Sequence, residues 1–279
     1  MLFPGQGSQT AEMRAAVAAA RPDLLELACE LVGDDPFERV DDGTRFQQPA
    51  IFCASLVGWE LAAAATRPVA LAGHSLGELA ALVAAGVLAE RDGLWLVVER
   101  GRLMQEAAES NGGGMVAVRA RREEVEPLLA RTGVALANEN APRQVVLAGP
   151  EAALVAAEAE LAAAGIRTVR LPVAGAFHSE AMRSVVGRFR AAAASVAFAE
   201  PRIPVVSCLL AAPPPDPRDA LVAGLTSPVR WVETLRALHD LGVERFVETG
   251  PGEVLTGLVR RTLPDAEAVP AAELEAVGG

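Results

Sequence analysis

The sequence predicts an α/β protein in which a small βαββαβ module interrupts a larger α/β domain. Three observations predict this fold class. An apolar run, a glycine-flanked turn and a helix-forming run follow one another between residues 66 and 89. After a glycine-rich break at 111–114, the expected elements have the order of a ferredoxin-like module. From residue 177 onward, longer helices and single strands alternate again.

The first of these units has the order of a nucleophile elbow. Pro68–Ala72 is a short apolar run that predicts a buried strand, and Glu78–Ala85 is rich in helix-forming residues. Between them lies Gly73-His74-Ser75-Leu76-Gly77, whose glycines permit a strained turn that exposes the serine hydroxyl. Asp92 is then expected to cap a helix that runs to about Ala108.

The module that follows is predicted from short apolar runs and two helical segments. The glycines at 112–114 are the expected hinge into it. We place the smaller subdomain at 115–175 and the larger one at 1–114 and 176–279. The expected elements of the module are strand Met115–Val118, helix Glu123–Ala130, strands Val134–Ala137 and Gln144–Ala148, helix Glu151–Ala164 and strand Thr168–Leu171.

The second part of the larger domain is expected to add two strands and two helices. A loop at 213–215 separates them into two groups. These elements are helix Ser184–Ala194, strand Pro204–Ser207, helix Trp231–Leu241 and strand Arg245–Glu248.

Composition narrows the possible classes of protein. The formal net charge of −11 argues against nucleic acid as a partner, because phosphate would be repelled. Three cysteines without a CxxC pair predict neither a disulfide framework nor a zinc site. No uncharged apolar run reaches the ~18–20 residues of a membrane span, and no basic segment opens the chain as in a signal peptide. We therefore expect a cytoplasmic protein without membrane attachment, and its compact start and end favour a free-standing enzyme.

Ser75 is the candidate nucleophile, because it occupies the exposed position of the predicted elbow. The following helix N-terminus favours negative charge that develops there. A serine nucleophile needs a base, and the chain has three histidines. His74 is expected to point away from its neighbour as a structural histidine, and His239 to lie on the surface of a helix. His178, in a loop, is therefore the candidate base by elimination.

The place of this base in the chain argues against an esterase of the α/β-hydrolase type. Such enzymes carry the catalytic histidine late in the chain, after the acidic residue. Here His178 precedes two further expected strands, and no histidine follows His239.

Arg100 is expected on the apolar face of its helix. A buried arginine needs an anion, since an unpaired buried charge is costly. Two interpretations stay open: an internal ion pair with a carboxylate, or a bidentate clamp for the carboxylate of a substrate. Its neighbours at helical spacing are Leu96, Val97, Leu103 and Met104.

Six motifs follow one another along nearly the whole chain. They are Phe3-Pro4-Gly5-Gln6-Gly7-Ser8-Gln9, Gly73-His74-Ser75-Leu76-Gly77-Glu78, Glu99-Arg100-Gly101-Arg102-Leu103-Met104-Gln105, Ala176-Phe177-His178-Ser179, Pro228-Val229-Arg230-Trp231 and Glu248-Thr249-Gly250-Pro251-Gly252. In this order they resemble the malonyl-CoA:acyl carrier protein transacylase family and the related acyltransferase domains of polyketide and fatty acid synthases. The resemblance implies a hydrolase-like larger subdomain with a parallel sheet and a ferredoxin-like smaller one.

The resemblance also implies the catalytic roles. Ser75 would be the nucleophile and His178 its base. A backbone carbonyl at Arg230, in place of an aspartate, would orient the histidine. Gln6 and the backbone N–H of Leu76 would form the oxyanion hole.

The substrate contacts are implied in the same way. Arg100 would bind the malonyl carboxylate, while Asn138 and Asn140 would line the CoA side of the cleft; His74 is grouped with these substrate-binding residues. Phe177 resembles the malonyl-selecting pattern of the synthase relatives, because an aromatic ring beside the acyl α-carbon crowds a methyl branch. One such contact biases selection by only ~1–3 kcal/mol.

The expected function is therefore ping-pong transfer of a malonyl group from malonyl-CoA to acyl carrier protein, in fatty acid or polyketide biosynthesis. No metal and no cofactor are expected, and the enzyme is expected to be a monomer. Because carriers of this family are acidic, docking would use local basic patches. The candidates are Arg119, Arg121 and Arg122, and Arg260 with Arg261, for each of which a solvated face is the alternative. A serine hydrolase or thioesterase and a non-catalytic interaction domain stay open as other functions.

Overall fold

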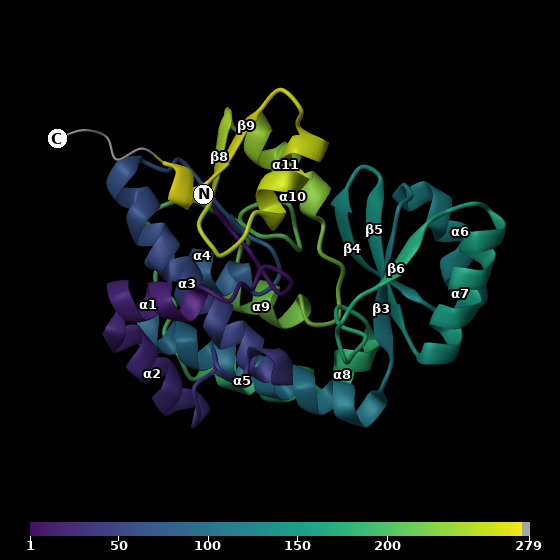
Figure 1. The fold of residues 1–279 in the computed structure, drawn as a ribbon, viewed down its shortest axis with the longest axis horizontal. Coiled ribbons are helices and arrows are strands. Elements are labelled where there is room, and N and C mark those ends of the chain that lie inside the picture. Colours follow the sequence, from purple (N-terminus) through teal and green to yellow (C-terminus); the bar gives the residue numbers. More distant parts are fainter. Residues whose placement is uncertain (275–279) are drawn as a thin grey trace.

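The computed structural model describes residues 1–274, which form two subdomains with a sheet in each (Figure 1). The sheet of the larger subdomain is parallel throughout, and β1 pairs with both β2 and β8. Its strands, in spatial order, are β7 (Val205–Val206), β2 (Leu71–Gly73), β1 (Leu2–Phe3), β8 (Arg245–Glu248) and β9 (Glu267–Pro270).

Both faces of this sheet are buried. Successive residues of a strand point to opposite faces. Accordingly, Phe3 and Leu71 belong to one apolar cluster, and Leu2 and Ala72 to another. Parallel sheets need such cover on both sides, which explains why β7, β2 and β1 at one side and the centre of the sheet contain only apolar residues and glycine.

The helices of the larger subdomain supply this cover. The first cluster is formed with α1 (Met13–Ala20), α2 (Pro22–Val32), α3 (Thr44–Ala65), α4 (Gly77–Ala84), α5 (Glu90–Asn111), α8 (Arg183–Ala194) and α9 (Pro217–Ala223). The second is formed with α10 (Trp231–Asp240) and α11 (Val254–Thr262). Short 3-10 turns lie at η1 (Val40–Asp42), η2 (Glu180–Met182) and η3 (Ala271–Glu273).

The smaller subdomain has the expected ferredoxin-like order and an antiparallel sheet. Helices α6 and α7 cover one side of that sheet (Figure 1). The elements are β3 (Gly114–Val118), α6 (Arg122–Thr132), β4 (Ala135–Ala141), β5 (Gln144–Gly149), α7 (Glu151–Ala163) and β6 (Thr168–Arg170), and the strand order is β4-β5-β3-β6. The predicted fold class is thus confirmed.

Backbone hydrogen bonds tie the two subdomains together. Val229 donates its N–H to the carbonyl of Ala137, and Glu139 donates its N–H to the carbonyl of Val229, both at 2.9 Å. Strand β4 therefore pairs with the segment just before α10. The chain enters the smaller subdomain through Gly112 and Gly113, whose φ angles of 64° and 88° favour glycine. We propose that the smaller subdomain comprises residues 115–175 and the larger one residues 1–114 and 176–279.

Helix α3 is the one described helix that is long and apolar enough to cross a membrane. In this fold 61% of its most apolar window is buried, and it packs against α1, α2, α4 and α5. We interpret α3 as a core helix, because its apolar surface is used inside the protein.

One predicted helix cap is wrong. Asp92 was expected to cap α5, but the helix starts at Glu90 and its N-cap is Ala89. Asp92 lies inside the first turn, where a negative charge is favourable next to the unpaired N–H groups.

Candidate active site

Ser75 stands at a strained turn between β2 and α4. Its φ is 53°, in the left-handed region that side chains rarely adopt. The flanking glycines are required by close backbone contact. A Cβ on Gly77 would lie 1.9 Å from the carbonyl oxygen of Phe3, and a Cβ on Gly73 would lie 2.0 Å from the carbonyl carbon of Gly77. The predicted elbow is therefore present, with the serine at its tip.

Ser75 and His178 form a hydrogen-bonded pair. The serine Oγ lies 2.7 Å from His178 Nε2. On the other side of the ring, Nδ1 lies 2.8 Å from the carbonyl of Gly224 and 3.2 Å from that of Ser227. Since carbonyls only accept, Nδ1 carries the proton and Nε2 is free to accept from the serine hydroxyl.

The imidazole is neutral in this setting. His178 is 6% exposed, and its φ of 57° is again left-handed. Burial, followed by the cation of Arg100, lowers the pKa of His178 to about 3. A neutral imidazole beside a serine hydroxyl can act as a general base.

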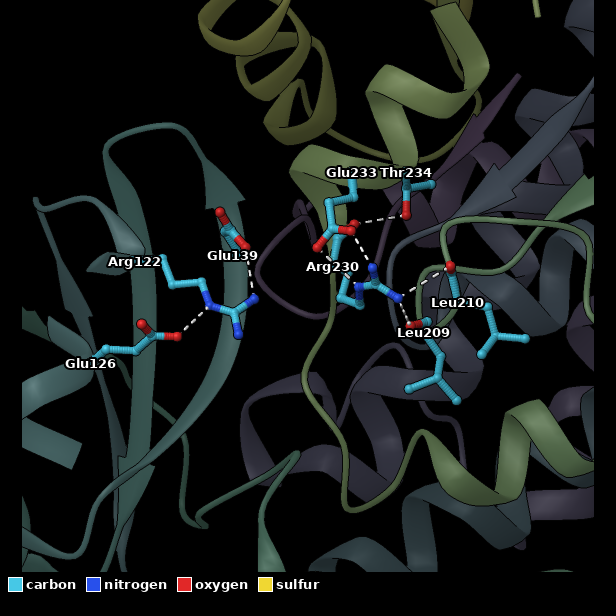
Figure 2. Close-up of polar contacts among 8 residues, drawn as sticks. All are labelled: Arg122, Glu126, Glu139, Leu209, Leu210, Arg230, Glu233 and Thr234. Atoms are coloured by element: carbon cyan, nitrogen blue, oxygen red, sulfur yellow. Dashed lines mark hydrogen bonds and ion pairs between the residues drawn. The ribbon is translucent and has the colours of Figure 1, made fainter. Parts of the chain in front are cut away.

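The prediction that the Arg230 carbonyl orients His178 is wrong. That carbonyl accepts from Thr234, whose N–H and Oγ1 lie at 2.9 and 2.8 Å, in the first turn of α10. The guanidinium of Arg230 pairs with Glu233 and also donates to the carbonyls of Leu209 and Leu210 (Figure 2). Because the helix uses the Arg230 carbonyl, the carbonyls of the preceding loop hold the ring instead.

Arg100 reaches the serine from the apolar face of α5. It is 4% exposed. Its Nη1 donates to Gln48 Oε1 at 2.8 Å, and its Nη2 donates to Ser75 Oγ at 3.0 Å. Within residues 1–274 no carboxylate lies within ion-pair distance of it, so the structure does not support the internal ion pair. Burial lowers the pKa of Arg100 to about 10, against the opposing effect of the buried Glu78 carboxylate, and this leaves Arg100 charged at neutral pH.

Two backbone N–H groups are candidates for an oxyanion site. Among the described residues, neither the amide of Gln6 nor that of Leu76 has a hydrogen-bond acceptor. The Gln6 side chain is engaged elsewhere: its Nε2 donates to Gln47 Oε1 at 2.7 Å and its Oε1 accepts from Thr44 Oγ1 at 2.7 Å. Any oxyanion contact from Gln6 would therefore come from its backbone.

A cavity of about 120 Å³ opens between the subdomains beside Ser75. Phe177, 5% exposed, lines it together with Asn138, Asn140 and His74. His74 Nε2 lies 2.8 Å from Asn140 Oδ1, and its ring packs edge-on against Trp231. The structure thus brings all the predicted substrate-binding residues except Arg100 to this cavity, and Arg100 lines the smaller one behind Ser75.

A basic groove lies where strands of the smaller subdomain meet α11 of the larger one. Its volume is about 710 Å³, and four exposed arginines line it: Arg119, Arg143, Arg167 and Arg261. Within the described part of the chain only Arg143 has a carboxylate within 4 Å, Glu124 at 3.7 Å. The groove unites one residue from each of the two predicted basic patches. Arg122 is not part of it, because it pairs with Glu126 and Glu139 (Figure 2).

Sequence reasoning missed four groups at this site. The carbonyls of Gly224 and Ser227 gave no signal, because any residue type offers a carbonyl. Gln48 and Glu78 did give a signal in the sequence, since each is a polar residue in an apolar helical run. Both are buried in the structure. Among residues 1–274 there is no cluster of three or more metal-ligating side chains.

The fold and the site define the class of protein first: an α/β acyltransferase, with a hydrogen-bonded serine–histidine pair and a buried arginine beside the serine. The chain matches the family of acyl transferase domains over residues 30–278. It is 42% identical to the polyketide biosynthesis protein ThaF of Burkholderia thailandensis, covering 94% of this chain but only 24% of that protein. It is 36% identical to the malonyl CoA-acyl carrier protein transacylase of Salmonella typhimurium, covering 93% of this chain and 91% of that one.

Solved structures agree with this assignment. The malonyl CoA-acyl carrier protein transacylase of Coxiella burnetii superposes with a TM-score of 0.92 at 31% identity, covering 99% of this chain and 94% of that one. A malonyl-transacylase in complex with the type II polyketide synthase carrier AntF has a TM-score of 0.89 at 33% identity, over 97% and 93% of the two chains. The chain belongs to the acyl transferase domain family.

Proposed function

We propose that this protein transfers a malonyl group from malonyl-CoA to the phosphopantetheine thiol of an acyl carrier protein, through an ester on Ser75. One observation carries the proposal. The Ser75 hydroxyl contacts both a neutral imidazole, His178, and a buried guanidinium, Arg100, which has no carboxylate within 4 Å among residues 1–274. A nucleophile placed between a base and an anion-binding cation suits an acyl group that bears a carboxylate.

In the first half-reaction Ser75 is acylated. His178 Nε2 takes the hydroxyl proton while Oγ attacks the thioester carbonyl carbon. The tetrahedral oxyanion accepts from the N–H groups of Gln6 and Leu76. The intermediate then expels the CoA thiolate, which takes the Ser75 proton from His178 and leaves as CoA thiol.

In the second half-reaction the carrier thiol takes the place of CoA. His178 accepts the thiol proton as sulfur attacks the malonyl ester. The same N–H groups hold the second oxyanion, and the proton returns to Ser75 Oγ as it leaves. Arg100 holds the malonyl carboxylate in both halves, so that the carbonyl carbon stays beside Ser75.

Malonyl is favoured over other acyl groups for two reasons. Arg100 rewards a carboxylate, because without one its buried charge has no direct ion-pair partner. Phe177 lines the cavity at Ser75 and would crowd a methyl branch on the α-carbon. The names of the transacylase relatives support this substrate, and ThaF supports a polyketide pathway as one setting.

The carrier is proposed to dock at the basic groove. An acidic carrier would be attracted there although the whole chain carries a formal charge of −11. The complex of a similar malonyl-transacylase with its carrier supports a carrier as the second substrate. We further propose that the enzyme is cytoplasmic and monomeric, and that it needs no metal or cofactor of its own.

The test separates a transferase from a hydrolase. The protein is loaded with malonyl-CoA, freed of CoA by rapid desalting, and mixed with holo-carrier or with buffer alone. We expect malonyl to appear on the carrier by intact mass spectrometry much faster than free malonate appears in buffer. Release of malonate at the same rate with and without carrier would show a thioesterase. A Ser75→Ala variant should not load at all.

A further inference from the structure

Glu78 is a buried carboxylate that the mechanism above does not use. It is the second residue of α4 and 4% exposed. Its Oε2 accepts from the backbone N–H of Cys208 at 3.0 Å, while its Oε1 has no hydrogen-bond partner within residues 1–274. A buried carboxylate is costly, and here burial raises its pKa. A buried carboxylate that costs free energy at this position therefore indicates a function for Glu78.

The bond from Cys208 fixes a turn next to the site. This turn, Ser207–Leu210, follows β7. Glu78 holds it from the inside of the molecule. Arg230 holds it from the other side, because its N–H donates to the carbonyl of Cys208 at 2.8 Å and its guanidinium reaches the carbonyls of Leu209 and Leu210 (Figure 2).

Through this turn, Glu78 connects the two halves of the catalytic pair. Its own N–H donates to the carbonyl of Ser75 at 3.1 Å, so it is fixed to the nucleophile elbow. The turn it holds is bonded to Arg230, which closely follows Ser227 in the chain, and the Ser227 carbonyl orients His178. Glu78 thus joins the element that carries the serine to the loop that holds the base.

The same carboxylate also faces the reacting groups. A cavity of about 20 Å³ lies behind the catalytic pair, lined by Ser75, His178, Arg100 and Glu78 among others. Glu78 is the acidic residue of that lining. We propose that Glu78 is a positioning residue, whose hydrogen bond to Cys208 sets the separation of Ser75 and His178. This inference rests on the proposed function, since it assigns a role in that reaction.

Two substitutions separate the reach of the side chain from its charge. Glu78→Gln keeps an oxygen at the same distance for Cys208 N–H but removes the charge. Glu78→Asp keeps the charge but is one methylene too short. If position matters, Glu78→Gln should retain kcat within about threefold, and Glu78→Asp should lose on the order of 100-fold, the effect of a displacement of about 1 Å. KM for malonyl-CoA should stay within about threefold in both, because Arg100 keeps its hydrogen bonds to Gln48 and Ser75.

A second measurement reads the catalytic pair without malonyl transfer. Phenylmethylsulfonyl fluoride modifies an activated serine, so its rate of reaction with Ser75 reports the pair even if the proposed acyl transfer were wrong. We expect this rate to fall with kcat in Glu78→Asp and to persist in Glu78→Gln. Loss of transfer with full labelling in the wild type would contradict the proposed function and leave the role of Glu78 standing.

Glu248 provides a matched control. It is also a buried carboxylate, 1% exposed, and accepts from the backbone N–H groups of Leu255 and Thr256 at 3.0 and 2.7 Å. Glu248→Asp should lower the melting temperature without changing kcat per folded molecule. The proposal is overturned if Glu78→Asp keeps its labelling rate, if Glu78→Gln is impaired tenfold or more, or if Glu248→Asp loses kcat equally. If Glu78→Asp does not fold, Glu78→Gln still tests the proposal, because a tenfold loss there would overturn it.

Discussion

At the scale of single residues, the base is held by peptide carbonyls and not by a carboxylate. The carbonyls of Gly224 and Ser227 fix the tautomer of His178, yet they bring no negative charge to stabilise an imidazolium. The nearby cation of Arg100 makes that form still less stable. If the malonyl carboxylate binds Arg100 as proposed, it would neutralise that cation, and the imidazolium would be easier to form. Substrate binding would thus activate its own base.

This arrangement predicts an unusual pH dependence. Because the pKa of His178 is lowered, its neutral form should persist well below the ordinary value of about 6.5. We expect kcat/KM for malonyl transfer to stay level down to about pH 5, since the profile of kcat/KM reports the free enzyme. The free energy of unfolding should also depend on pH. Because His178 resists protonation in the folded state but not in the unfolded state, stability falls as the pH drops from 6.5 toward 3. An acid limb of kcat/KM centred near pH 6.5 would contradict this.

The same residues show how far the sequence could predict the site. Ser75 was predictable from its glycines, His178 by elimination among three histidines, and Arg100 from helical spacing. The Arg230 carbonyl was wrongly predicted, because sequence does not show which carbonyl of a loop faces a ring and which is used by the next helix. That choice depends on the fold of the loop between α9 and α10.

At the scale of elements, the elbow depends on contacts between backbones. The helix that begins at Gly77 lies directly against β1, at the carbonyl of Phe3. This closeness places the helix N-terminus and the Leu76 N–H beside the serine. It also brings the Gln6 loop to the same place, because β1 runs directly into it.

A substitution at Gly77 tests this contact. Gly77→Ala would place a Cβ 1.9 Å from the Phe3 carbonyl oxygen, so β1 and α4 must separate. We expect a loss of about 3 kcal/mol or more in the free energy of unfolding, measured by urea denaturation. The control is Gly187→Ala in the exposed part of α8, where a Cβ meets nothing within 4 Å. It should stabilise the protein by about 0.5–1 kcal/mol. Equal effects of the two would contradict the account.

Elements were predictable where the pattern was long and local. The βαββαβ order and helices α7 and α10 were found within a residue or two of their bounds. The parallel sheet was only partly visible. Its central strand, Leu2–Phe3, has two residues, and β9 was not predicted at all. Such short strands form because they pair with strands that are distant in the chain, as Leu2 pairs with Glu248. A local sequence pattern cannot indicate this pairing.

At the scale of the whole molecule, the surface charge is unevenly distributed. The chain is acidic, yet the groove of Arg119, Arg143, Arg167 and Arg261 gathers exposed positive charge from both subdomains. Two of these residues come from patches visible in the sequence. The other two were not predicted, because they are isolated in the chain and only the fold brings them together.

This groove predicts how carrier binding responds to charge and salt. Arg167→Glu with Arg261→Glu should raise KM for the carrier about tenfold or more at low ionic strength, and the difference should shrink as salt screens the contact. Loading of Ser75 from malonyl-CoA should not change. The matched control reverses Arg14 and Arg91, which lie in surface ion pairs. Unchanged carrier KM, or an equal loss of malonyl-CoA loading, would exclude the groove as the docking site.

The central claim is that Ser75 accepts an acyl group whose carboxylate is held by Arg100, and one competition experiment tests it most directly. Wild type and Arg100→Ala are each mixed with equal amounts of malonyl-CoA and acetyl-CoA, and the group on Ser75 is identified by mass spectrometry. The account predicts almost only malonyl on the wild type. In the variant this preference should fall by about tenfold or more, because the malonyl carboxylate would be buried without its cationic partner. If Arg100→Ala loads malonyl with undiminished preference, the account is contradicted.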